Sequence, residues 1–229
     1  NYTKMPNTLS QPAKENAIAE LIRQSSPRYD FFLMVTLAIA IASFGVILDD
    51  TPVLIGSMLI APVLYPVLTL ALGLVIRGPT LIARSLLTLF IAVGCALGVG
   101  VLLGLLFHPA IAPNNNILET MASELYAPGI IFVAFLAGLA AAFGNLKKSL
   151  GSMLPGVSIA LSLVPPLATA GVGASQFSWD ILSNGLLIFF INVICIVVAA
   201  AIVFSLFGLG RKRTFTRATV RADEKQRTT

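Results

Sequence analysis

Charge is the scarcest property of this sequence. Only 11% of its 229 residues are Asp, Glu, Lys or Arg, 57% are hydrophobic, and the mean hydropathy is +0.91. Soluble domains carry about 25% charged residues, so this composition excludes an ordinary soluble domain and indicates an integral membrane protein. Six apolar windows contain no charged residue at all, and each is long enough to cross a hydrocarbon core of about 30 Å. They are residues 31–48, 52–76, 85–107, 128–145, 150–173 and 181–208.

Cysteine and histidine are also scarce. The two cysteines, Cys95 and Cys195, lie within apolar windows, where we expect reduced side chains rather than a disulfide or a metal site. His108, the single histidine, has no Cys or carboxylate at ligand spacing. We therefore expect no metal and no cofactor. The hydroxyls of the windows also lack a titratable partner, so we do not expect an enzyme that works within the bilayer.

The fifteen lysines and arginines are confined to alternate loops. They lie before the first window, between the second and third windows at Arg77 and Arg84, after the fourth window at Lys147, and in the C-terminal tail. The other loops carry only acidic charges, such as Asp49 and Glu119. With six spans, the positive-inside rule predicts a multi-pass protein of the inner (cytoplasmic) membrane with both termini cytoplasmic. We expect the partner of this charge to be the lipid bilayer and not nucleic acid, and the tail to be a solvated, partly disordered anchor.

The chain also contains an internal repeat. The sequence GSML occurs at 56–59 and at 151–154, and an offset of 100 residues aligns further identical residues. Each half then holds three spans, so the second half must enter the membrane from the opposite side. The sequence therefore predicts an all-α fold of six transmembrane helices arranged as two inverted three-helix repeats. The identical pairs are Pro66 and Pro166, Thr69 and Thr169, Gly73 and Gly173, Leu86 and Leu186, Leu87 and Leu187, Phe90 and Phe190, Ile91 and Ile191, Val93 and Val193, Cys95 and Cys195, Leu106 and Leu206, and Phe107 and Phe207.

This repeat sets the expected boundaries along the chain. We expect a cytoplasmic arm over 1–30, repeats over 31–107 and 128–210, an external loop over 108–127 and a basic cytoplasmic tail over 211–229. An amphipathic helix is predicted ahead of each repeat. The first, PAKENAIAELIRQS, has Ile18, Leu21 and Ile22 on one face, and the second, NNILETMASEL, has Asn116 and Glu119 at capping-box spacing. Because the chain begins with Asn1, we expect it to be part of a longer product.

Proline and glycine interrupt the second and fifth windows at corresponding places. The broken backbone of such a helix leaves amides or carbonyls that lipid cannot satisfy, and equivalent broken helices of inverted repeats often surround a binding site. We therefore predict a solute path between these two helices. Its candidate residues are Gly56, Ser57, Pro62, Tyr65, Pro66, Thr69, Ser152, Pro155, Ser162, Pro165, Pro166, Thr169 and Asn192.

The chemistry of the windows favours particular solutes. Buried acidic residues, the usual mark of proton and cation carriers, are missing, whereas the N-termini of half-helices suit anions or polar neutral solutes. The sequence thus indicates a transporter or channel for a small solute of one of these kinds. Alternatively, the breaks only shape the bundle of a membrane scaffold, a lipid-binding protein or a signalling protein. On that interpretation Asn192 makes an interhelical hydrogen bond and Tyr65 only packs.

Small residues four apart predict close helix contacts, either within one protomer or in a homo-oligomer. In the third window they are Gly94 with Gly98 and Gly100 with Gly104, and in the fourth window they are Ala134, Gly138 and Ala142.

Three segments resemble the signature segments of the bacterial and archaeal membrane family known as domain of unknown function 389. They are IGSMLIAPVLYPVLTLALGLV, SIALSLVPPLATAGVG and LLIFFINVICIVVAAAI, and the resemblance extends over residues 31–208. The resemblance implies the membrane fold. Many members carry an additional soluble cytoplasmic domain, which we do not expect within these 229 residues. The resemblance implies no established activity. The residues at motif positions are Gly56, Met58, Leu59, Pro62, Pro66, Val164, Pro165, Pro166, Leu167 and Asn192.

Overall fold

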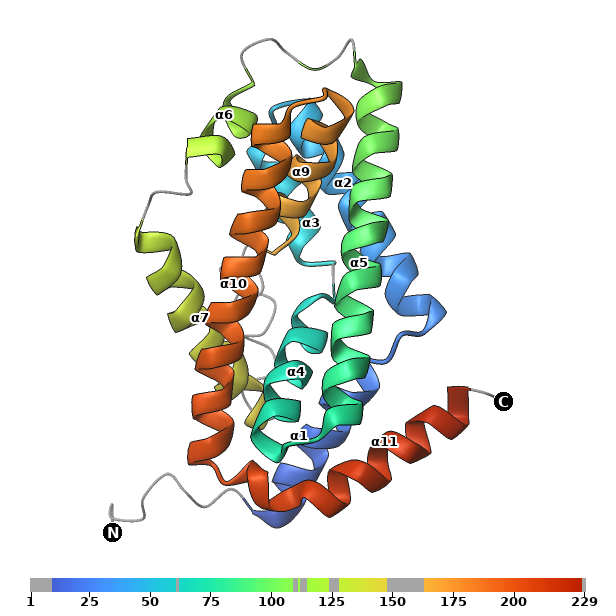
Figure 1. The fold of residues 1–229 in the computed structure, drawn as a ribbon, viewed down its shortest axis with the longest axis vertical. Coiled ribbons are helices and arrows are strands. Elements are labelled where there is room, and N and C mark those ends of the chain that lie inside the picture. Colours follow the sequence, from blue (N-terminus) through green and yellow to red (C-terminus); the bar gives the residue numbers. More distant parts are fainter. Residues whose placement is uncertain are drawn as a thin grey trace.

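The described part of the chain is built from helices, with no strand among its residues. The computed structural model describes residues 10–60, 62–108, 111, 115–123, 128–147 and 163–227. Four of its helices are long and apolar enough to cross a membrane: α2 (Tyr29–Ile47), α5 (Pro79–Leu106), α7 (Pro128–Leu146) and α10 (Trp179–Leu206) (Figure 1). They coincide with the first, third, fourth and sixth apolar windows. The protein is thus an all-α, membrane-embedded protein.

The second window is broken, as the sequence predicts. Helix α3 (Thr51–Met58) ends after eight residues and α4 (Leu64–Ile76) begins after Val63, so neither piece alone is long enough to cross a hydrocarbon core. Of the fifth window, the structure describes the part that forms α9 (Val164–Ser175), while its glycines Gly151 and Gly156 lie outside the described residues.

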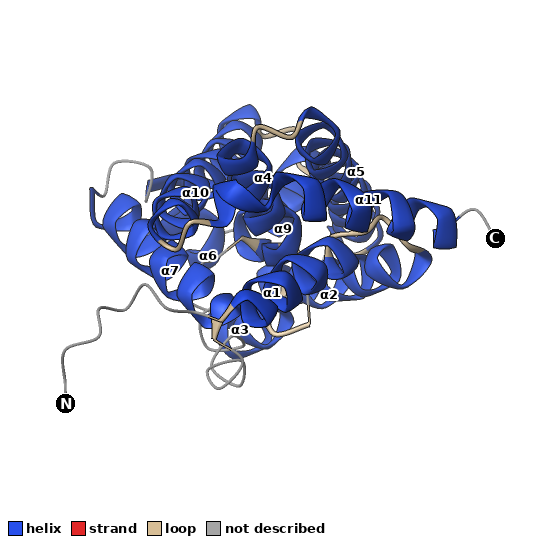
Figure 2. Cartoon of the chain, turned by 90° about the horizontal axis from the view of Figure 1, so that it is seen from below, coloured by secondary structure: helices blue, strands red, loops and turns tan. Residues whose placement is uncertain are grey.

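The short helices α4 and α9 lie inside the bundle. Helix α9 packs against α2, α5 and α10, and Figure 2 shows it at the centre of the end-on view. All of its residues are buried except Ala174, which is partly exposed. Helix α4 is covered by α5, α10 and α1 (Gln11–Gln24), and ten of its thirteen residues are buried. Helices α4 and α9 therefore contribute much of the core, while the long helices carry most of the exposed apolar surface.

Glycine allows α5 to approach α9 closely. A methyl group built on Gly100 would lie 2.8 Å from Cα of Gly171, and one on Gly104 would overlap Ser175. Likewise, a methyl group on Gly138 of α7 would lie 2.9 Å from Cα of Ile196 in α10. These contacts confirm close packing for part of the predicted small-residue set. Gly94 and Gly98, in contrast, have nothing within 4 Å and face outward on α5.

The offset of 100 residues also aligns helix boundaries and turns. Helices α5 and α10 each have 28 residues and begin at Pro79 and Trp179, while α4 and α9 begin at Leu64 and Val164. The turn between each short helix and its long partner has the same form. Arg77 and Phe177 have φ of 54° and 57°, and the amides of Gly78 and Ser178 donate to the carbonyls of Gly73 and Gly173 at 2.9 and 3.1 Å. Figure 1 shows these two turns at opposite ends of the bundle.

The two ends of the molecule differ in charge. Helices α1 and α11 (Arg213–Arg227), the 3-10 helix η4 (Leu209–Lys212) and the α4–α5 turn lie toward one end, and these segments carry basic residues. Helix α6 (Asn116–Ser123), the α2–α3 turn and the α9–α10 turn lie at the other end, with the acidic residues Asp49, Asp50, Glu119 and Asp180. The separation of charge predicted from the sequence is therefore present in the fold.

Both predicted amphipathic helices form, with one correction. In α1 the predicted residues Ile18, Leu21 and Ile22 are fully buried. In α6 the cap is Asn115 rather than Asn116, because the Asn115 side-chain oxygen accepts the amide of Leu118 at 3.0 Å. The Asn116 side chain instead donates to Asp49 at 2.8 Å. The Asn116 side chain thus attaches α6 to the α2–α3 turn and does not cap its own helix.

The expectation of a partly disordered tail is wrong for residues 213–227. These residues form α11, in which Thr216, Val220 and Asp223 are buried at helical spacing. The helix packs against α1, and the buried carboxylate of Asp223 explains why it is held there. Arg217 and Arg221 remain on its exposed side.

Candidate functional site

The candidate site is the interior region in which α3 ends and both α4 and α9 begin. From this level α4 runs toward the basic end of the bundle and α9 toward the acidic end, so the two N-termini face the middle of the molecule (Figure 1). No side chain of the described residues caps either N-terminus, since the flanking residues Val63 and Leu163 are apolar. The positive ends of two helix dipoles therefore lie in the apolar interior.

Proline reduces the number of amide donors at these N-termini. The second and third residues of α9 are Pro165 and Pro166, which have no N–H group, so its first turn presents only the amides of Leu163 and Val164 beyond helical bonding. In α4, Pro66 removes a donor, and the amide of Tyr65 donates to the Pro62 carbonyl at 3.3 Å. The region can thus offer a solute two positive helix ends, with only a few amide groups left to donate hydrogen bonds to it.

The hydroxyls of the predicted site donate to backbone carbonyls. Ser57 donates to Leu54 at 2.6 Å and Thr169 donates to Pro165, both within their own helix or its first turn. Thr69 donates instead to the Leu21 carbonyl of α1 at 3.1 Å. The remaining lone pairs of these oxygens can accept hydrogen bonds from a solute, but the hydroxyl protons are engaged.

Asn192 lies on the face of α10 that covers the region. A methyl group on Gly185 would lie 2.6 Å from the Pro166 carbonyl, so that face packs on the start of α9. Asn192 follows seven residues later, on the same face and about 10 Å further toward α4. It is 2% exposed, and α10 contacts both α4 and α9. The fold therefore buries Asn192 on α10, the helix that contacts both short helices.

The other predicted site residues differ in burial. Pro66, Pro165 and Pro166 are buried, whereas Gly56, Pro62 and Tyr65 are partly exposed. Three candidates, Ser152, Pro155 and Ser162, lie outside the described residues.

Comparison with known proteins gives a family. The model of the family described as "Domain of unknown function (DUF389)" matches residues 58–198, which is more than half of the chain. The chain belongs to the DUF389 family. An uncharacterized protein of Methanocaldococcus jannaschii, MJ0678, is 29% identical over 191 residues, which are 82% of this chain and 58% of that protein. The chain thus spans less than two thirds of the length of this relative. No solved structure matches the chain.

The DUF389 match includes most of the candidate site, without Gly56 and Ser57, and leaves out helices α1 and α11 at the basic end. Residues 58–198 contain α4, α9 and Asn192, while α1, most of α3 and α11 lie outside the match. Among the described residues of this DUF389 protein, no group of three or more His, Cys, Asp or Glu could hold a metal ion, and both cysteines are free thiols.

A buried ion pair at the basic end is the feature that sequence reasoning missed. Arg84 of α5 pairs with Asp223 of α11, and both side chains are 8% exposed. The other oxygen of Asp223 accepts Arg28 at 2.7 Å, and the Ser26 hydroxyl donates to Asp223 at 3.0 Å. Removing one member of such a buried pair costs about 3–5 kcal/mol, so this pair holds α11 against α5, while Arg28 and Ser26 join α11 to the α1–α2 turn. Its sequence signal is the helical spacing of Thr216, Val220 and Asp223 within an otherwise basic tail.

Proposed function

We propose that this DUF389 protein is a membrane transport protein, either a transporter or a channel, for a small solute. The observation that carries the proposal is the pair of uncapped helix N-termini of α4 and α9, both of which point toward the middle level of a bundle of apolar helices. A protein that only needed to fill its core would gain nothing from two such interruptions, because continuous helices satisfy their own backbone groups.

The proposed solute is a small anion or a polar neutral molecule. Two positive helix ends favour negative charge, and the apolar windows contain no carboxylate that would hold a cation. Asn192 and the accepting lone pairs of Ser57 and Thr169 supply uncharged polar contacts. The solute would pass between the second and fifth spans.

The proposed architecture has six spans in two inverted three-helix repeats. The shared boundaries and the matching left-handed residues Arg77 and Phe177, at opposite ends of the bundle, support it. We place the protein in the inner membrane with the basic end, and therefore both termini, in the cytoplasm, following the charge of the two ends. A homo-oligomer is also part of the proposal, since Gly94 and Gly98 leave room for a second copy against α5.

The experiment is solute uptake and ionic current in proteoliposomes across a panel of anions, cations and small neutral solutes. The variants are Asn192→Ala and Pro166→Ala. Their matched controls are Ser183→Ala, an exposed polar residue of the same helix, and Pro79→Ala, an exposed proline at the start of α5. We expect selective flux in the wild type that changes in the two site variants and not in the controls. If folded and inserted protein gave neither uptake nor current for any solute of the panel, the result would favour a membrane scaffold that does not transport.

A further inference from the structure

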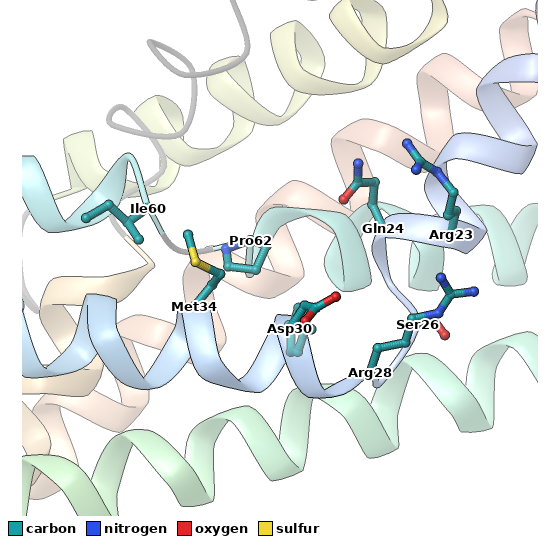
Figure 3. Close-up of a pocket in the computed structure, with 9 residues that line it drawn as sticks. Arg23, Gln24, Ser26, Arg28, Asp30, Met34, Ile60 and Pro62 are labelled. Carbon is teal, nitrogen blue, oxygen red and sulfur yellow. The ribbon is translucent and has the colours of Figure 1, made fainter. Parts of the chain in front are cut away.

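A groove lies between the α1–α2 turn and the break that separates α3 from α4. Its volume is about 350 Å³, and its lining residues come from the end of α1, the start of α2 and the α3–α4 connection. Figure 3 shows that its polar side chains gather at one end, among them Arg23, Arg28 and Asp30. Met34, Ile60 and Pro62 line the other end. The groove is therefore amphipathic along its length.

The apolar end of the groove opens onto surface that faces lipid. Met34 is 40% exposed, and its neighbours Leu33 and Leu37 on α2 are similarly exposed, as are Ile55 and Leu59 beside the break. Four residues separate Asp30 from Met34 along α2, a rise of about 6 Å. The polar end lies toward the basic end of the bundle, where headgroups would be, and the apolar end lies deeper, where acyl chains would be.

The charges at the polar end suit a headgroup that carries both signs. Arg23 is paired with Glu20 at 2.8 Å and Arg28 with Asp223 at 2.7 Å, so each guanidinium already has one acidic partner. Both arginines still have N–H groups that can reach a phosphate, because each guanidinium has five. Asp30 adds an exposed carboxylate in the first turn of α2. Because Asp223 also pairs with Arg84, the three arginines exceed their two acidic partners by one positive charge. A phosphate would compensate that charge, and an ammonium group would compensate Asp30.

We propose that this groove binds a phospholipid, with its phosphate between Arg23 and Arg28, a headgroup ammonium on Asp30, and the start of an acyl chain along Met34, Ile60 and Pro62. The groove shares Pro62 with the predicted solute path, but its test needs no transport. A bound lipid would link the α1–α2 turn to the break, since it touches both.

Native mass spectrometry of the purified full chain in detergent tests the proposal, with phosphatidylethanolamine, phosphatidylglycerol and phosphatidylcholine added in turn. We expect the wild type to retain phosphatidylethanolamine about tenfold more tightly than phosphatidylcholine, because a primary ammonium donates hydrogen bonds to a carboxylate and a trimethylated one does not. Equal retention of the three lipids by the wild type would overturn the proposal without any variant.

Two substitutions of exposed side chains locate the site. Asp30→Asn should abolish the preference for phosphatidylethanolamine, and Arg23→Gln should weaken all three lipids severalfold. Arg217→Gln, an exposed arginine of α11 outside the groove, is the matched control and should leave retention unchanged. An equal loss in Arg217→Gln would mean attraction to charge in general and would contradict a built site.

Soluble glycerophosphoethanolamine distinguishes a lipid from a free headgroup. We expect it to displace bound phosphatidylethanolamine poorly, because it cannot fill the apolar end. Ile60→Trp, which fills that end, should reduce lipid retention and leave the weak binding of glycerophosphoethanolamine unchanged. Efficient displacement by glycerophosphoethanolamine would show a site for a soluble phosphate compound and would overturn the lipid assignment.

Discussion

Thr69 and Thr169 occupy equivalent positions in α4 and α9, yet their hydroxyls have different acceptors. Thr169 donates to the Pro165 carbonyl of its own helix, whereas Thr69 donates to the Leu21 carbonyl of α1 at 3.1 Å. Both hydroxyls are fully buried. The same residue therefore closes a turn of helix in one half and attaches α1 to the core in the other.

Thr69→Val should loosen α1 without unfolding the core. The substitution keeps the shape of the side chain and removes a hydrogen bond with a net value of about 1 kcal/mol, which corresponds to about fivefold faster amide exchange in α1 if local opening is sufficient. Exchange across residues 11–24 measures it. Thr169→Val is the control and should leave α1 unchanged, because its hydroxyl does not reach α1. Equal acceleration in both variants would contradict this role of Thr69.

At the scale of the elements, the close crossing of α5 and α9 depends on the glycines of α5. Gly100→Ala would place a methyl carbon 2.8 Å from the backbone of Gly171, which cannot move aside as a flexible side chain could. Overpacking of this kind costs about 1–3 kcal/mol, and we expect that loss in the unfolding free energy measured in detergent.

Gly94→Ala is the matched control on the same helix. Nothing lies within 4 Å of a methyl group built there, so the substitution should be neutral or, through helix propensity, should stabilise by up to about 1 kcal/mol. A loss at Gly94 comparable to that at Gly100 would indicate that α5 packs differently, for instance against a second copy of the chain.

Helix α6 is attached to the α2–α3 turn by a carboxylate, so its attachment should depend on pH. Asp49 accepts the Ile117 amide at 2.9 Å and the Asn116 side chain at 2.8 Å, and these bonds lower the pKa of Asp49. Their contribution is complete above the unfolded pKa of about 3.9 and is lost as pH falls through the lower folded pKa.

Amide exchange of residues 116–123, corrected for the intrinsic rate at each pH, should therefore accelerate below about pH 4 in the wild type. Asp49→Asn should remove this pH dependence, since asparagine tolerates the left-handed backbone at this position, where φ is 54°, and does not titrate in this range. An unchanged acid profile in Asp49→Asn would assign the pH dependence to another group.

Hydropathy and helix-breaking residues predicted most of these elements. Long apolar runs identified α2, α5, α7 and α10, and Pro62 and Pro66 identified the break, because both signals arise within a few residues of sequence. The sequence indicates Thr69 and Asn192 as candidates only because they are polar residues in apolar helices. That Thr69 binds α1, and that Asn192 is buried on a helix that packs against both α4 and α9, depend on tertiary contacts between segments far apart in the chain.

The ion pair of Arg84 and Asp223 shows why the basic end could not be predicted. The two residues are separated by more than half of the chain, and the tail that contains Asp223 has the composition of a solvated segment. The average composition of the tail is basic and gives no sign that one of its carboxylates is buried. The helical spacing of Thr216, Val220 and Asp223 is the sequence signal for a packed helix. The basic composition of the tail instead favours the prediction of a solvated segment.

At the scale of the whole molecule, the two turns that share their geometry lie at opposite ends. Arg77 and Phe177 are both exposed and both adopt the left-handed conformation, so replacing either by cysteine imposes similar backbone strain. They are therefore a matched pair for testing on which side of the membrane each end lies. The background is Cys95→Ala with Cys195→Ala, which removes both native thiols.

Labelling of intact cells with a membrane-impermeant maleimide should modify Phe177→Cys, and Arg77→Cys only after permeabilisation. The reason is that the α4–α5 turn lies at the basic end and the α9–α10 turn at the acidic end, and positive charge is retained on the cytoplasmic side. Modification of both from the same side would contradict opposite insertion of the two halves. Labelling of Arg77→Cys from outside and Phe177→Cys from inside would keep the inverted arrangement and reverse its orientation, since the two ends would then have exchanged sides.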